Sequence, residues 1–89
     1  MKIHWKILVI GKVQGMWFRK STQQEARKLG LTGTVKNQED GSVYIEVEGE
    51  ETAMKEFLAW CSIGSELANV QHLKMTKGEP CDYNSFNIV

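Results

Sequence analysis

Residues 11–19, Gly-Lys-Val-Gln-Gly-Met-Trp-Phe-Arg, join an apolar strand pattern to a helical pattern through a short loop bracketed by glycines. This order gathers unpaired backbone N–H groups and the positive end of a helix dipole around one small volume. Arg19 adds a guanidinium in the first turn of the expected helix. The stretch therefore predicts a strand-to-helix transition whose loop suits a tetrahedral dianion.

The length and composition of the chain predict one small cytoplasmic domain spanning residues 1–89. Eleven basic and eleven acidic residues balance, so no broad field attracts nucleic acid or an anionic membrane. The longest apolar run, at residues 7–10, is too short to span a bilayer, and no leader opens the chain. Cys61 and Cys81 lack metal-ligand spacing, and we expect free thiols in preference to a disulfide.

Hydrophobic periodicity predicts the order of the secondary structure elements. Residues 3–10 are apolar on both faces and indicate a central strand. Val70 differs in parity from Leu73 and Met75, which indicates a bulge or a short strand there. The other expected elements are a helix at 18–29 closed by Gly30, strands at 31–36 and 42–48, a helix from Glu50 and Glu51 to Gly64, a strand at 68–76, and a short terminal strand around Phe86 and Ile88.

This order is β-α-β-β-α-β followed by a short terminal strand. It predicts an α+β protein with the ferredoxin-like split βαβ layout, in which two helices cover one face of an antiparallel sheet. Because this layout hosts many unrelated functions, the fold alone does not decide the activity.

The start of the first helix lacks the usual capping chemistry. No Ser, Thr, Asp or Asn precedes Met16, and Arg19 and Lys20 add positive charge at the positive end of the dipole. Each such charge is unfavourable by a few tenths to ~1 kcal/mol unless an anion binds there. We interpret the missing cap as a site that a ligand fills. The alternative is a helix that begins later, at Ser21 or Thr22, each of which fits a capping-box pattern.

Arg19 differs from its neighbours because it is one of only two arginines in a chain that otherwise uses lysine. Its planar fork of donors matches two phosphoryl oxygens, which a lysine point charge does not. The neighbouring side chains have simpler interpretations. Lys12 fits a solvated strand end, Trp17 and Phe18 fit packing residues, and Asn37 by itself fits ordinary turn chemistry.

Two motifs resemble those of the acylphosphatase family. Residues 11–19 resemble its first motif, Gly-x-Val-Gln-Gly-Val-x-Phe-Arg, and residues 33–43, Gly-Thr-Val-Lys-Asn-Gln-Glu-Asp-Gly-Ser-Val, resemble its second, Gly-aromatic-Val-x-Asn-x-x-x-Gly-x-Val. Their order and separation, the length and the expected layout all match the family. Three positions depart from it: Met16 replaces valine, Thr34 stands where an aromatic residue is expected, and Ser65 stands where proline is common.

The resemblance implies metal-independent hydrolysis of acyl phosphates to a carboxylate and inorganic phosphate, without a cofactor or a covalent intermediate. Arg19 falls on the arginine that grips the phosphoryl group, and Asn37 falls on the asparagine that positions the attacking water. Inorganic phosphate or sulfate would bind the same site, and we expect a monomer. The substrate-binding loop, through its backbone N–H groups, would be Gln14, Gly15, Met16, Trp17 and Phe18.

Two other functions stay open at this point. One is a non-catalytic anion-binding module on the same fold, although the presence of both Arg19 and Asn37 favours the enzyme. The other is single-stranded RNA binding on the sheet. That function is weakly supported because the strand at 42–48 lacks the glycine-and-aromatic RNA-binding octamer, and its exposed face carries Glu46 and Glu48.

Overall fold

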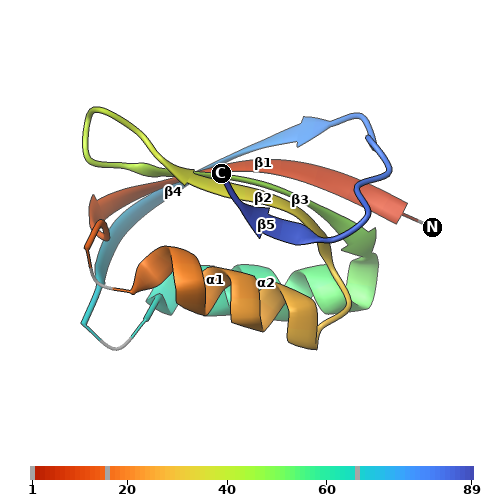
Figure 1. The fold of residues 1–89 in the computed structure, drawn as a ribbon, viewed down its shortest axis with the longest axis horizontal. Coiled ribbons are helices and arrows are strands. Elements are labelled where there is room, and N and C mark those ends of the chain that lie inside the picture. The colour runs from red at the N-terminus through yellow and green to blue at the C-terminus, as the bar shows by residue number, and fades with distance from the viewer. Residues whose placement is uncertain (1, 16, 66) are drawn as a thin grey trace.

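The chain forms two helices packed on one face of a five-stranded sheet, as the computed structural model in Figure 1 shows. The structure describes residues 2–15, 17–65 and 67–89. The predicted order of elements and the ferredoxin-like layout are confirmed. The elements are β1 (Lys2–Lys12), α1 (Phe18–Lys28), β2 (Thr32–Asn37), β3 (Val43–Glu50), α2 (Glu51–Ile63), β4 (Asn69–Gly78) and β5 (Phe86–Ile88).

The strands lie in the order β4-β1-β3-β2-β5, with β1 inside the sheet as predicted. Three of the strand pairs, β1–β3, β1–β4 and β2–β3, are antiparallel, whereas β5 pairs with β2 in parallel. The prediction of an antiparallel sheet is therefore wrong for the terminal strand. Residues 79–85 turn the chain back at one end of the sheet, so β5 runs opposite to β4. Because β2 also runs opposite to β4, β5 and β2 must run in the same direction.

The core lies between the sheet and the helices. Phe57 of α2 contacts Phe86 of β5, with ring centroids 6.2 Å apart, so the short terminal strand is anchored to the second helix. Removing an aromatic side chain from such a position costs about 3–5 kcal/mol. The apolar side chains with no exposed surface are Ile7, Val9, Ala26, Val35, Val43, Ile45, Val47, Phe57, Cys61 and Phe86.

The predicted bulge in the fourth strand is confirmed. Ile10 pairs with His72 and Gly11 pairs with Val70, so Gln71 is an extra residue on β4. Gly11 has φ 142°, and a Cβ at this position would collide with the backbone carbonyl of Asn69. A glycine is thus required where β1 ends and the loop toward α1 begins.

Helix α1 ends at Lys28, one residue before the expected boundary, and Gly30 closes it as the sequence predicts. Gly30 has φ 74°, its N–H donates to Arg27 O, and the N–H of Leu31 donates to Ala26 O. These two bonds form a Schellman motif, which satisfies carbonyls at the helix end. Ala26 and Leu31 are both buried, so the same turn starts β2 against the core.

The open face of the sheet is covered at one end by the segment of residues 79–85. Glu48 is fully buried there, so the expectation that it lies on an exposed face of its strand is wrong, and it faces His4, which is 1% exposed. The carboxylate of Glu48 lies 2.8 Å from His4 Nδ1 and accepts hydrogen bonds from the backbone N–H groups of Cys81 (2.7 Å) and Tyr83 (3.2 Å). One buried side chain on β3 therefore holds the connection between β4 and β5 against the sheet.

Neither helix is long and apolar enough to cross a bilayer, within the part of the chain that the structure describes. The two cysteines are free, as predicted, with Cys61 buried in the core and Cys81 exposed. Burial raises the pKa of the Cys61 thiol well above its ordinary value.

Candidate active site

A pocket of about 380 Å³ lies where the loop after β1, the start of α1 and the ends of β2 and β5 converge at one end of the molecule. It brings together Arg19 at the start of α1 and Asn37 at the end of β2, two residues that the sequence motifs assign to one site. The residues that line it are Val13, Gly15, Trp17, Phe18, Arg19, Lys20, Asn37 and Ile88.

The helix that borders the pocket begins at Phe18, and the alternative start at Ser21 or Thr22 is wrong. Thr22 Oγ1 donates to Phe18 O at 2.7 Å, a bond inside the helix, and Ser21 N donates to Trp17 O at 2.9 Å. Trp17 occupies the N-cap position, its side chain makes no capping hydrogen bond, and the first turn carries no acidic residue. The predicted absence of a cap is confirmed.

The uncapped start has an electrostatic consequence for the pocket. The first N–H groups of a helix have no intrahelical partner and carry the positive end of its dipole. Arg19 and Lys20 place two cationic side chains beside these donors. Gly15, with φ 75°, has open space where a Cβ would lie, so the loop before the helix is uncrowded. The positive end of the helix dipole and the two cationic side chains all favour an anion in the pocket.

Asn37 is held in place by the β2–β3 hairpin. It pairs with Val43, and the turn beyond it is closed by the bond from Gln38 N to Ser42 O at 2.8 Å. Asp40 accepts hydrogen bonds from the hydroxyl and the backbone N–H of Ser42, and these bonds lower the pKa of the Asp40 carboxyl. The turn is therefore locked by its own polar groups, which leaves the amide of Asn37 available to the pocket.

Thr34, the residue that stands in place of an aromatic one, does not disturb this arrangement. Side chains alternate between the faces of a strand, so Asn37 has the same parity as Val35, which is fully buried against the helices. Thr34 has the opposite parity, lies on the open side of the sheet and pairs with Asn87 of β5. The departure from the family motif thus affects the other face of β2.

Gln14 was predicted as a substrate-binding residue, but it is not among the residues that line the pocket. Its side-chain amide donates to Gln38 O at 2.6 Å and to Ser42 O at 2.9 Å. These bonds tie the loop that precedes α1 to the hairpin that carries Asn37. The side chain of Gln14 therefore aligns the two halves of the site, a role that the sequence pattern did not reveal.

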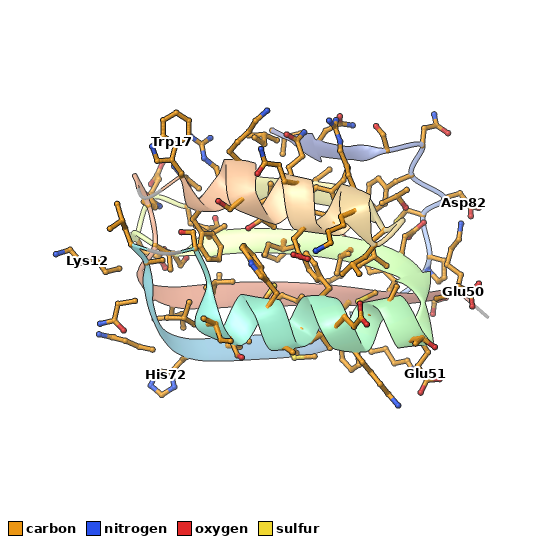
Figure 2. All side chains as sticks on the ribbon, turned by 90° about the horizontal axis from the view of Figure 1, so that it is seen from below. Lys12, Trp17, Glu50, Glu51, His72 and Asp82 are labelled. Atoms are coloured by element: carbon orange, nitrogen blue, oxygen red, sulfur yellow. The ribbon has the colours of Figure 1, made fainter. Side chains whose placement is uncertain are left out.

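The two aromatic residues of the loop behave differently. Phe18 is 1% exposed and packs against Trp60, with ring centroids 5.6 Å apart, which confirms it as a packing residue. Trp17 is 76% exposed, so its prediction as a packing residue is wrong. Its left-handed backbone, φ 57° and ψ 17°, turns the indole outward at the end of the molecule where Lys12 also lies (Figure 2). Met16, also predicted in the substrate-binding loop, lies outside the described residues.

Sequence reasoning missed two residues that line the pocket, Val13 and Ile88, whereas Lys20 was already named as a positive charge at the helix start. Val13 flanks the predicted loop, and its contribution follows from its position in the chain. Ile88 comes from β5 at the other end of the sequence, and nothing in the motifs signals it. Lys12 is exposed at the end of β1 and does not line the pocket, as expected of a strand-end lysine.

One trio of possible metal ligands, His4, Glu48 and Cys81, comes together within residues 2–15, 17–65 and 67–89, with its ligand atoms within 4.8 Å of one another. It lies at the opposite end of β1 from the pocket. Burial alone would raise the pKa of Glu48, but hydrogen bonds from His4 and from the backbone N–H groups of Cys81, Tyr83 and Asp82 outweigh it and lower the pKa. This network holds the fold and takes no part in the pocket.

Comparison with known proteins identifies the class to which this fold and pocket belong. The sequence model of the acylphosphatase family matches residues 5–88. An acylphosphatase of Marinobacter nauticus is 51% identical over 78% of this chain and 75% of its own length, and one of Archaeoglobus fulgidus is 43% identical over 93% of each. The crystal structure of acylphosphatase from Bacillus subtilis superposes with a TM-score of 0.95 at 38% identity, over 98% of both chains.

The chain therefore belongs to the acylphosphatase family. The function of this family is the hydrolysis of acyl phosphates, the mixed anhydrides of a carboxylic acid and phosphoric acid.

Proposed function

We propose that this chain hydrolyses acyl phosphates in the pocket between α1 and the β2–β3 hairpin, with Arg19 and Asn37 as its catalytic residues. The observation that carries the proposal is the convergence of Arg19 and Asn37 at a helix start without a side-chain cap. Arg19 grips two oxygens of the phosphoryl group, and the backbone N–H groups of residues 14–15 and 17–19 cradle the oxygens.

The chemistry requires little beyond positioning and charge stabilisation. The oxygen of a water molecule attacks phosphorus, the bond between phosphorus and the bridging oxygen breaks, and the carboxylate leaves with the bonding electrons. A carboxylate is a good leaving group, so a general acid is not needed. Holding the nucleophile in line and neutralising the phosphoryl charge then provide the rate acceleration, and the cationic groups of the pocket supply that neutralisation without a metal or cofactor.

Asn37 acts on the water. An amide is too weak a base to remove a proton, but its carbonyl oxygen accepts a hydrogen bond from the water and fixes its direction of attack. A phosphoryl oxygen of the substrate takes the proton as the new bond forms, so the products are the free carboxylate and inorganic phosphate. Inorganic phosphate or sulfate binds the same cradle as a product-like ligand.

The chain acts as a single domain over residues 1–89, as a monomer, in the cytoplasm. The cytoplasmic location is supported by the two free thiols, which suit a reducing compartment. If the chain is a monomer, sedimentation equilibrium at micromolar concentration should give a mass of 10.1 kDa.

The test is the hydrolysis of benzoyl phosphate by the purified chain in excess EDTA, with p-nitrophenyl phosphate as a monoester control. The expected result is turnover of the acyl phosphate that EDTA does not reduce, without comparable turnover of the monoester. Activity that disappears with EDTA and returns with a divalent cation would contradict the mechanism. Binding of phosphate without turnover would favour the non-catalytic module.

A further inference from the structure

The indole of Trp17 is the most exposed large apolar side chain among the described residues, at 76%. Tryptophan is highly buried on average in folded proteins, so such exposure is informative. Trp17 also lines the same pocket as Arg19 and Asn37. An apolar surface is thus kept in water beside an anion site.

The backbone of Trp17 is held in a conformation that is unfavourable for a residue with a Cβ. Its φ of 57° and ψ of 17° lie in the left-handed region, which glycine, asparagine or aspartate adopts more easily. This geometry separates two consecutive aromatic side chains, because Phe18 turns into the core while Trp17 turns outward. Strained residues of this kind cluster at ligand sites, where the surrounding structure holds them.

The pocket has two chemically different sides. Arg19, Lys20 and Asn37 supply cationic and polar groups, whereas Val13, Trp17 and Ile88 supply apolar ones. Ile88 is 37% exposed, so β5 contributes an accessible aliphatic surface to the pocket. A ligand that fits both sides carries an anionic group and an adjoining apolar group.

An acyl phosphate has this construction. Its carbonyl carbon is two bonds from phosphorus, so a phosphoryl group in the loop of residues 14–19 brings the acyl substituent against the residues that surround the loop. Trp17 is part of that loop, lines the pocket and exposes its side chain to solvent. Aromatic rings bind flat apolar groups by stacking, beyond the effect of buried area alone.

We propose that the indole of Trp17 is a platform for the acyl group, with Ile88 beside it, and that this chain thereby prefers acyl phosphates with aromatic or large apolar acyl groups. This preference rests on the proposed hydrolysis in the same pocket. The platform acts on the acyl group equally before and during the reaction, so it contributes uniform binding. Its effect falls on KM and leaves kcat largely alone.

The test compares kcat and KM for benzoyl phosphate and acetyl phosphate in the wild type, Trp17→Ala, Trp17→Phe and Ile63→Ala. Ile63 is the matched control because it is 74% exposed and does not line the pocket. In Trp17→Ala the ratio of kcat/KM for benzoyl over acetyl phosphate should fall roughly 3- to 10-fold through KM, the size expected for one lost aromatic contact. Trp17→Phe should keep most of the preference, and Ile63→Ala should keep all of it.

Calorimetric titration with two non-hydrolysable analogues separates this inference from the proposed reaction. In phenacylphosphonate and acetonylphosphonate a methylene replaces the bridging oxygen. The wild type should bind the phenacyl compound more tightly, and Trp17→Ala should lose that difference. Equal affinities in the wild type, no binding of phenacylphosphonate, or a difference that survives in Trp17→Ala would overturn the platform. An absence of turnover combined with the expected affinities would overturn only the hydrolysis.

Discussion

Replacing Gln14 by alanine tests whether the alignment of the two halves of the site matters. Gln14 Nε2 donates to Gln38 O at 2.6 Å and to Ser42 O at 2.9 Å, and the substitution removes both bonds. Neither carbonyl is left without a partner, since Gly41 N still donates to Gln38 O and Gln38 N still donates to Ser42 O. The hairpin should therefore persist but lose its connection to the loop of residues 13–17.

The size of the effect follows from these two bonds. Each net hydrogen bond contributes about 0.5–1.5 kcal/mol, and because the acceptors stay partnered, the total loss should lie near 1–2 kcal/mol. For a domain of this size, each kcal/mol lowers Tm by roughly 4–8 °C, so a fall of roughly 4–16 °C is expected. A displacement of catalytic groups by about 1 Å costs up to 10²-fold in rate. We expect kcat for benzoyl phosphate to fall by roughly 10- to 100-fold.

A double-mutant cycle with Asn37→Ala shows where Gln14 acts. If Gln14 works by positioning Asn37, the double variant should be about as slow as Asn37→Ala alone, which should lose roughly 10²–10³ in kcat. Gln24→Ala is the matched control, because Gln24 is an exposed glutamine on α1 and its loss should change stability by less than about 0.5 kcal/mol. Rate losses that multiply in the double variant, or a Gln14→Ala protein as stable and active as the wild type, would refute the positioning role.

Two further predictions concern opposite ends of the molecule. Arg19→Lys keeps the charge but loses the bidentate fork, so kcat/KM should fall by about 10²–10³. The rise in Tm that saturating phosphate gives the wild type should become smaller in this variant as well. Near-normal activity in Arg19→Lys would show that Arg19 does not bind the phosphoryl group. The pKa of Glu48 is lowered in the folded state, so its contribution is fully present above the ordinary value of 4.5 and is lost as the pH falls through the lower, folded value. Thermal unfolding between pH 7 and 2.5 should therefore show a steeper loss of stability below pH 4.5 in the wild type than in Glu48→Gln. The exposed control Glu51→Gln should follow the wild type, and identical slopes in all three proteins would contradict the assignment.

The features that the sequence predicted correctly are those that neighbouring residues determine. The missing cap before Phe18 can be recognised from the absence of a short polar side chain there, and the end of α1 at Gly30 follows from backbone freedom. The bulge at Gln71 is signalled by a change of parity within β4. Each of these depends on the residue types within a few positions, so a single sequence contains the information.

The features that were missed depend on contacts between distant segments. Gln14 reaches carbonyls in the β2–β3 turn, and Ile88 enters the pocket only because β5 pairs in parallel with β2. Trp17 was expected to pack inward because its side chain is largely apolar, but its left-handed backbone directs that side chain to solvent. The motifs indicated which residues to expect in the candidate site, and contacts between distant segments determine how the side chains of Gln14 and Ile88 are placed.

The two edges of the sheet have a consequence for the behaviour of the protein at high concentration. An exposed edge strand offers unpaired backbone groups to a strand of another molecule, which is a route to aggregation. Here one edge, β5, is only three residues long, and the other, β4, is interrupted by the bulge at Gln71 and carries Lys74 and Lys77. Short length, a bulge and lysine side chains each make an edge a poor template for such pairing. The two edge strands therefore protect the sheet against pairing with strands of other molecules.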